Sequence, residues 1–274
     1  MQSPNSGAPG DAQASRLRAQ DITIGYERRI IARDLSLDIP HRGFTVIVGP
    51  NACGKSTLLR ALSRLLAPHA GAVLLDGQSI SDIPPKQVAR RLGLLPQASS
   101  APDGISVADL VSRGRYPHQN LLHRWSVADE QAVDRALRLA RVEDLAERAV
   151  DELSGGQRQR VWIAMVLAQE TPLLLLDEPT TFLDIAHQVE LLNLLRRLNR
   201  QEGTTIVAVL HDLNLACRYA DFMVAMSAGR ILASGTPEEI VTAELLKEVF
   251  GLDCMIIEDP VSHTPLIVPL ENAD

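Results

Sequence analysis

The sequence predicts an α/β fold built around a parallel β-sheet. Five short and nearly all-apolar runs are spaced along the chain, and stretches with helical periodicity separate them. Such strands are typical of parallel sheets covered by helices on both faces. The predicted strands span residues 44–48, 92–95, 173–176, 205–210 and 221–226.

Two regions depart from this alternation. Residues 22–26 and 35–39 show apolar alternation with period two, which predicts antiparallel structure near the N-terminus. Between Ser106 and Gln169 the pattern is helical, as in residues 128–140, whose apolar side chains repeat on one face. We therefore expect a helical subdomain inserted into the core at about residues 98–169.

The ends of the chain differ in character. Residues 1–15 are rich in Pro, Gly and Ser and lack the pattern of a signal peptide, which predicts a disordered tail. Residues 16–270 then form one domain. Two apolar stretches after Gly251 predict a small β appendage at about residues 251–270.

Composition narrows the class of protein. Hydrophobic residues make up 46% and charged residues 22%, as in an ordinary globular protein, and the net charge of -7 argues against a nucleic-acid partner. No apolar run approaches the roughly 20 residues that cross a bilayer. Cys53, Cys217 and Cys254 show no paired spacing, which favours a reducing, cytoplasmic compartment.

Residues 49–57 match the phosphate-loop pattern G-x-x-x-x-G-K-[S/T], between a predicted strand and a predicted helix over 55–66. Backbone N–H groups of such a loop cradle phosphate oxygens at the positive end of the following helix. Lys55 is expected to reach the β- and γ-phosphates and Ser56 to ligate Mg²⁺. The alternative is an accidental glycine turn. The candidate ATP-binding residues here are Gly49, Pro50, Asn51, Ala52, Cys53, Gly54, Lys55, Ser56 and Thr57.

Four leucines followed by Asp177 and Glu178 supply the acidic partner of this loop. Asp177 ends a buried strand, at the edge of the sheet where ligands of open α/β folds bind. We expect Asp177 to hold Mg²⁺ and Glu178 to act as the general base toward water. Read alone, such a run is more often a core strand with a solvated end; the phosphate loop favours the functional interpretation.

The run Ser154, Gly155, Gly156 and Gln157 after Leu153 resembles the signature sequence of ATP-binding-cassette (ABC) ATPases. This resemblance, which covers roughly residues 18–270, implies that the signature completes the ATP site of a partner subunit. Two chains would then enclose two ATP molecules. Read without the resemblance, a Ser-Gly-Gly helix cap could be structural only.

The resemblance also implies roles for four isolated residues. Gln97 resembles the glutamine that senses the γ-phosphate and contacts Mg²⁺, and Asp184 the aspartate at the dimer seam. His211 resembles the switch histidine, and Tyr26 the aromatic residue that stacks on adenine; the alternative for Tyr26 is a packing tyrosine. Ala52 departs from the family, which usually has glycine there.

Residues 114–119, with 209–214 and 254–261, resemble ATPases that drive uptake of ferric siderophores, closest to the ferric-enterobactin type. Relatives that import haem or cobalamin are the alternative. The resemblance implies that residues 102–124 dock a membrane permease, although they could form only a solvated loop. It also implies an identical partner chain, an indirectly attached substrate-binding protein, and a peripheral position on the cytoplasmic face of the inner membrane.

Two alternatives are a soluble cassette protein and the ATPase of an exporter. Soluble cassette proteins acting on ribosomes or DNA usually carry two cassettes or a long inserted coiled coil, and this sequence shows neither. An exporter ATPase shares every catalytic motif. The sequence therefore predicts an ATPase that uses ATP and Mg²⁺, with import as the preferred direction.

Overall fold

A computed structural model describes residues 15–27, 29–97, 99–119 and 125–271. Its central sheet has six strands in the order β10-β9-β3-β8-β7-β6. Neighbours from β9 to β6 pair in parallel, which confirms the predicted sheet, and β10 joins antiparallel at one edge. The strands are β3 (Phe44–Val48), β6 (Leu92–Leu95), β7 (Leu173–Asp177), β8 (Thr205–Val209), β9 (Phe222–Ser227) and β10 (Arg230–Gly235).

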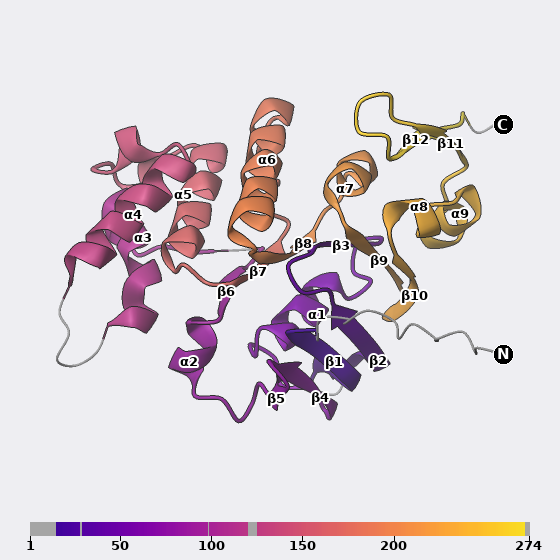
Figure 1. Ribbon diagram of the computed structural model, residues 1–274, viewed down its shortest axis with the longest axis horizontal. Helices are drawn as coiled ribbons and strands as arrows, with labels where there is room; N and C mark the ends of the chain where they lie inside the picture. Colours follow the sequence, from indigo (N-terminus) through magenta and orange to yellow (C-terminus); the bar gives the residue numbers. More distant parts are fainter. Residues whose placement is uncertain (1–14, 28, 98, 120–124, 272–274) are drawn as a thin grey trace, which may run out of the picture.

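A second sheet of four strands confirms the antiparallel structure expected near the N-terminus. Its order is β2-β1-β4-β5, and it lies across the central sheet from α6 and α7 (Figure 1). The sequence pattern located only part of each of the first two strands, because β1 has irregular register that interrupts the alternation. The strands are β1 (Leu17–Tyr26), β2 (Arg29–Ile39), β4 (Ala70–Leu75) and β5 (Gln78–Ser79).

The helices between β6 and β7 are α3 (Val107–Ser112), η1 (Arg113–His118), α4 (Val127–Leu139), η2 (Glu143–Leu145), η3 (Val150–Glu152) and α5 (Gly155–Ala168). Of these, α3, α4 and α5 gather at one side of the molecule (Figure 1). The remaining helices are α1 (Lys55–Leu62), α2 (Pro85–Ala89), α6 (Ile185–Glu202), α7 (Leu213–Tyr219), α8 (Pro237–Ile240) and α9 (Ala243–Phe250). Among the described residues, no helix has both the length and the apolarity that a bilayer crossing needs.

Several predicted boundaries need correction. Helix α1 ends at Leu62 rather than at residue 66, because Arg64 takes a left-handed conformation with φ of 68°. The signature run leads into a helix predicted over residues 158–168, and this helix, α5, begins three residues earlier, at Gly155, because Ser154 caps it. The two C-terminal apolar stretches pair antiparallel as β11 (Cys254–Glu258) and β12 (Pro265–Pro269), as predicted. The predicted disordered tail lies, except for Ser15, outside the described residues.

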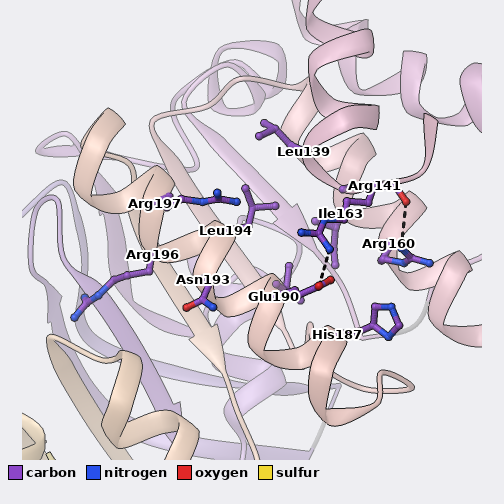
Figure 2. A pocket seen from close by; sticks show the side chains of 12 residues that line it. Leu139, Arg141, Arg160, Ile163, His187, Glu190, Asn193, Leu194, Arg196 and Arg197 are labelled. Carbon is purple, nitrogen blue, oxygen red and sulfur yellow. Dashed lines mark hydrogen bonds and ion pairs between the residues drawn. The ribbon is translucent and has the colours of Figure 1, made fainter. Parts of the chain in front are cut away.

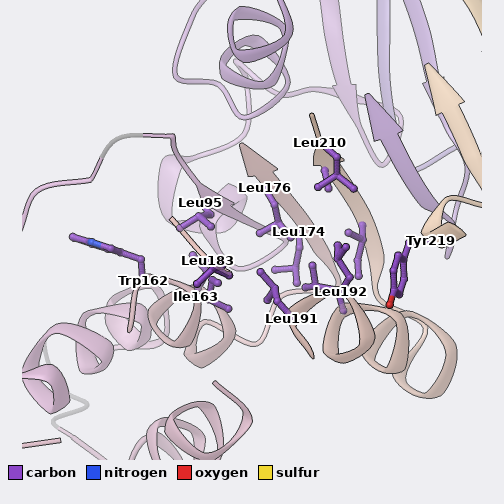
Figure 3. Close-up of a cluster of buried hydrophobic side chains, with 14 of the residues drawn as sticks. Leu95, Trp162, Ile163, Leu174, Leu176, Leu183, Leu191, Leu192, Leu210 and Tyr219 are labelled. Atoms are coloured by element: carbon purple, nitrogen blue, oxygen red, sulfur yellow. The ribbon is translucent and has the colours of Figure 1, made fainter. Parts of the chain in front are cut away.

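The core is divided by the central sheet into two apolar clusters. Along β7, Leu174 and Leu176 belong to the cluster that includes Leu191 and Leu192 of α6 (Figure 3). The alternate leucines of β7 belong to the cluster that includes α1 and the antiparallel sheet. Burying each such side chain contributes about 2 kcal/mol. This double-sided burial fixes β7 in the sheet and brings Asp177 and Glu178 to its carboxyl end.

Candidate functional site

The carboxyl ends of β3, β7 and β8 meet at one edge of the sheet, because β8 pairs in parallel with both of its neighbours. The segments that follow these strands enclose a cavity of about 650 Å³. It is lined by Tyr26, Arg29, Ile31, Asn51, Ala52, Gly54, Lys55, Ser56, Thr57, Gln97, Glu178 and His211. Residues from several predicted motifs thus share one cavity.

The phosphate loop has a backbone that depends on glycine. Gly49 has φ of 155°, and a Cβ atom there would lie 2.2 Å from the carbonyl oxygen of Met226. Gly54 has φ of 111° at the start of α1. Ala52 also takes a positive φ, 61°, at a cost of about 1 kcal/mol for a residue with a Cβ atom. Alanine at position 52, where the resembling family usually has glycine, therefore keeps the left-handed conformation but adds strain to the loop.

Lys55 lies under the loop and is only 5% exposed. Its Nζ donates to the carbonyl oxygens of Gly49 at 2.8 Å and Pro50 at 2.9 Å. An ammonium group has three N–H donors, so one remains for a ligand. The loop's own carbonyl groups hold the cation where a phosphate oxygen could accept that third donor.

Ser56 lines the cavity and contacts Asp177, which is buried behind it and is not itself a lining residue. The Ser56 hydroxyl donates to Asp177 Oδ1 at 3.0 Å, and Asp177 is 3% exposed. Burial raises the pKa of the Asp177 carboxyl, the Ser56 hydrogen bond opposes this, and the charge on Glu178 adds to it. A hydroxyl and a carboxylate are the hard oxygen donors that Mg²⁺ prefers. The pair therefore fits that ion, whose charge would favour the ionised carboxylate.

Glu178 and His211 form an ion-pair geometry at the same edge. His211 Nε2 lies 2.7 Å from Glu178 Oε1, and the Glu178 side chain is 12% exposed against 45% for His211. Glu178 has φ of 54°, which starts the turn after β7. The structure thus brings together two residues that are 33 positions apart in the sequence.

Tyr26 lies at the rim of the cavity and is 41% exposed. Its hydroxyl accepts a hydrogen bond from Arg60 Nη1 at 2.8 Å, which fixes the ring without burying it. This exposure argues against the alternative of a packing tyrosine. Arg29 and Ile31 line the same cavity, and sequence reasoning missed them because they belong to no motif.

Three phosphate-loop candidates, Gly49, Pro50 and Cys53, are not among the residues that line the cavity. Cys53 is 5% exposed and belongs to an apolar cluster. The Gly49 and Pro50 carbonyl groups act through Lys55 instead. These three residues shape the loop, whereas the cavity surface comes from residues 51–52 and 54–57.

The signature residues do not line this cavity either. Ser154 caps α5: its hydroxyl accepts from Gln157 N at 3.3 Å, and Gln157 Oε1 accepts from Ser154 N at 3.1 Å. Both glycines lie beside Phe182, which is 75% exposed. Asp184 is exposed too and caps α6 by accepting from His187 N at 2.9 Å. None of these residues lines the cavity described above. Gly155 and Phe182 line a neighbouring pocket, and Gln97 lines both.

Comparison with known proteins places this geometry in a family. The family model described as ABC transporter matches residues 32–181, and the ferric enterobactin transport ATP-binding protein FepC of Escherichia coli is 57% identical over 93% of this chain and 94% of its own length. The chain belongs to the ABC transporter ATP-binding subunits. The probable siderophore transport ATP-binding protein YusV of Bacillus subtilis is 54% identical over 93% of both chains.

Solved structures of ABC transporters share the fold. An inward-facing metal-chelate type ABC transporter matches with a TM-score of 0.79 and 30% identity, over 94% of this chain and 98% of that one. The bacterial ABC transporter cassette MJ0796, solved as a dimer, matches with a TM-score of 0.73 and 26% identity, over 80% of this chain and 98% of that one. A structure of the same cassette holds ADP and phosphate after hydrolysis. This ABC subunit is an ATPase that binds ATP.

Proposed function

We propose that this ATPase powers the import of a ferric siderophore across the cytoplasmic membrane, as one of two identical copies attached to a membrane permease. The names of FepC and YusV support the cargo class, since both relatives match more than nine tenths of the chain at 54–57% identity. The permease in turn receives its cargo from a substrate-binding protein. The ATPase works at the cytoplasmic face of the membrane.

In this proposal the cavity beside β3, β7 and β8 binds ATP. Tyr26 stacks on adenine, the phosphate loop donates backbone N–H groups, and the third N–H of Lys55 contacts the terminal phosphates. Ser56, Asp177 and Gln97 would hold Mg²⁺. The ion supplies positive charge that neutralises the phosphate oxygens.

Glu178 is the proposed general base. Its carboxylate accepts a proton from the attacking water, and His211, 2.7 Å away, keeps that carboxylate turned into the cavity. His211 therefore acts on the water through Glu178 and on the terminal phosphate directly.

The observation that carries the dimer proposal is the separation of the two anion-binding elements in one chain. The helix cap at Ser154 with its glycines faces outward and shares no lining residue with the ATP cavity. A second copy, turned by a two-fold axis, can place its capped helix against the first copy's ATP. Asp184 and the exposed Phe182 then lie at the seam.

The helical subdomain at about residues 98–169 is the proposed site of permease docking. Within it, Arg113–His118 packs on the end of α5, and Tyr116 remains 71% exposed. The proposed docking segment spans residues 102–124, of which 120–124 lie outside the described residues. The proposed domain as a whole spans residues 16–270, which include this subdomain and the C-terminal appendage at 251–270.

Uptake of radioactive iron by a strain lacking its own siderophore ATPase tests the proposal. We expect the wild-type gene, expressed with its own permease and binding protein, to restore uptake of ferric enterobactin, and the Glu178→Gln variant not to restore it. Haem and cobalamin uptake serve as comparison cargoes. Restored uptake of either of these, without uptake of any ferric siderophore, would overturn the proposed cargo class.

A further inference from the structure

A second cavity, of about 410 Å³, lies between α4, α5 and α6, and it shares no lining residue with the ATP cavity (Figure 2). Its size falls in the range of about 300–1,000 Å³ typical of small-molecule pockets, which are frequent at the junction of structural units. Nothing in the proposed ATPase mechanism uses it.

Basic side chains dominate the polar part of this cavity. Arg141, Arg160, Arg196 and Arg197 line it together with His187, and Glu190 is its one acidic lining residue. Glu190 is already paired, because Arg141 Nη1 lies 2.5 Å from its Oε1. Arg196 is paired outside the cavity with Asp221 at 2.7 Å.

Two guanidinium groups remain without a carboxylate partner among the described residues, those of Arg160 and Arg197. Arg160 Nη1 donates to the carbonyl oxygen of Arg141 at 3.1 Å, which leaves its other N–H groups open. Arg160 comes from α5 and Arg197 from α6, so the two charges approach the cavity from different helices.

The remaining lining is apolar. Ile163, Leu191 and Leu194 belong to the buried core, and Leu139 adds a further aliphatic side chain. An apolar surface beside unpaired guanidinium groups suits a ligand that joins an apolar body to an anionic group. An inorganic ion would leave the apolar surface uncovered, and a neutral apolar molecule would leave the guanidinium groups unpaired.

The geometry points to a second ligand site in this chain: the cavity between α4, α5 and α6 binds a small organic anion whose acidic group pairs with Arg160 or with Arg197, which lie on opposite sides of Ile163 and Leu194 (Figure 2). Such a ligand bridges the helical region to α6. The ligand would also lie near Asp184 of the proposed dimer seam. His187 lines the cavity, and its Nδ1 lies 2.8 Å from Asp184 Oδ1.

Fluorescence titration with two probes of related ring structure tests the site. 8-Anilinonaphthalene-1-sulfonate carries an anionic group, and N-phenyl-1-naphthylamine is its neutral counterpart. With excess ADP in the ATP cavity, we expect the sulfonate to bind the full chain at one site per chain. The neutral probe should bind at least tenfold more weakly.

Substitutions separate this site from general surface binding. The Arg160→Gln/Arg197→Gln variant should weaken sulfonate binding at least tenfold and leave the neutral probe unchanged. The control Arg138→Gln/Arg200→Gln removes two arginines outside the cavity and should bind like wild type. If the double variant loses its ADP-dependent rise in melting temperature, Arg160→Gln and Arg197→Gln are measured singly, and one of the two should show the tenfold loss of sulfonate binding.

Equal affinity for the two probes, or unchanged sulfonate binding by the Arg160→Gln/Arg197→Gln variant, would overturn the proposed site. Since the measurement needs neither ATP hydrolysis nor transport, its result is independent of the proposed import function.

Discussion

The burial of Asp177 makes its ionised form costly to the stability of the metal-free chain, although the proposed metal site needs that form. Its carboxyl is buried, which raises its pKa, so the folded chain without metal binds the proton more tightly than the unfolded chain does. Ionisation therefore costs stability above the folded pKa, and this cost disappears as the pH falls below the ordinary carboxyl range. A bound cation would remove the cost at neutral pH.

Asp177→Asn should therefore separate the two effects. Without nucleotide at neutral pH, we expect its melting temperature to equal or exceed that of wild type, and the difference to shrink as the pH is lowered. Mg-ATP at 100 times the wild-type Kd should stabilise wild type by about 2.7 kcal/mol. The same concentration should stabilise the variant by far less, because its Kd is expected to be higher. Thermal unfolding followed by circular dichroism measures both, with Asp144→Asn as an exposed control.

A clear loss of stability in nucleotide-free Asp177→Asn, at neutral pH, would contradict the assigned cost of ionisation. Retention of the full Mg-ATP effect would contradict the role in metal binding.

Glu178 is the proposed general base, so turnover should depend on it. Glu178→Gln keeps the size of the side chain and its hydrogen bonding but cannot accept the proton from water. We expect kcat for ATP hydrolysis to fall about 100- to 10,000-fold while ATP affinity is kept. Phosphate release and equilibrium ATP binding measure the two quantities.

Glu238→Gln, an exposed change outside the cavity, is the control and should hydrolyse ATP at the wild-type rate. If the Glu178→Gln variant hydrolysed ATP at a rate comparable to this control, Glu178 would be excluded as the base.

At the scale of elements, a buried ion pair ties η1 to α4 and α5. Arg115 Nε donates to Asp129 Oδ1 at 2.9 Å, and Arg115 Nη1 donates to the Ala168 carbonyl oxygen at 2.7 Å. The side chains of Arg115 and Asp129 are 6% and 8% exposed. Burial favours the neutral form of Asp129, but hydrogen bonds from Ser126 and Arg115 outweigh it and lower the pKa of this carboxyl.

Asp129→Ala should destabilise the chain strongly, because it leaves the buried Arg115 with Glu170 as its one remaining carboxylate partner and removes the N3 carboxylate from the capping box of α4. We expect a loss of about 3–5 kcal/mol in the free energy of unfolding, measured with urea. The contribution of Asp129 is present above the ordinary carboxyl pKa and is lost as the pH falls through its lowered folded pKa. Asp134→Ala, on the exposed face of α4, should change stability by less than about 0.5 kcal/mol; a similar small effect at Asp129 would show that the pair is not needed.

At the scale of the whole molecule, the two proposed anion-binding elements lie on different parts of one chain and would form one site only in the proposed dimer. Ser154→Arg places a long cation at the proposed contact with the partner's ATP. In the Glu178→Gln background with ATP, we expect the parent to sediment as a dimer and the Ser154→Arg variant as a monomer.

Ser126 offers a matched control for this change. It caps α4 with the same capping box that Ser154 forms on α5, so Ser126→Arg removes an equivalent cap. This control should dimerise like the parent. Dimerisation of the Ser154→Arg variant with unchanged affinity would contradict the proposed arrangement, whatever the cargo.

The local motifs were predictable because each depends on neighbouring residues. The phosphate loop, the strand that ends in Asp177 and the helix cap at Ser154 are each set by runs of a few positions, so apolar periodicity and turn chemistry suffice to place them. Their assigned chemical roles stay predictions. The boundaries of α1 and α5 were less predictable, because a single left-handed residue or cap decides them.

The parallel sheet and the family could be predicted from contiguous residues, since apolar strands buried on both faces and the phosphate-loop and signature motifs are each local patterns. Which distant residues meet depends on how the elements pack. The strand order places β8 between β3 and β7, and this brings His211 to Glu178. The approach of β2 to the phosphate loop adds Arg29 to the ATP cavity. Such contacts depend on how whole elements pack, and no local pattern in the chain encodes them.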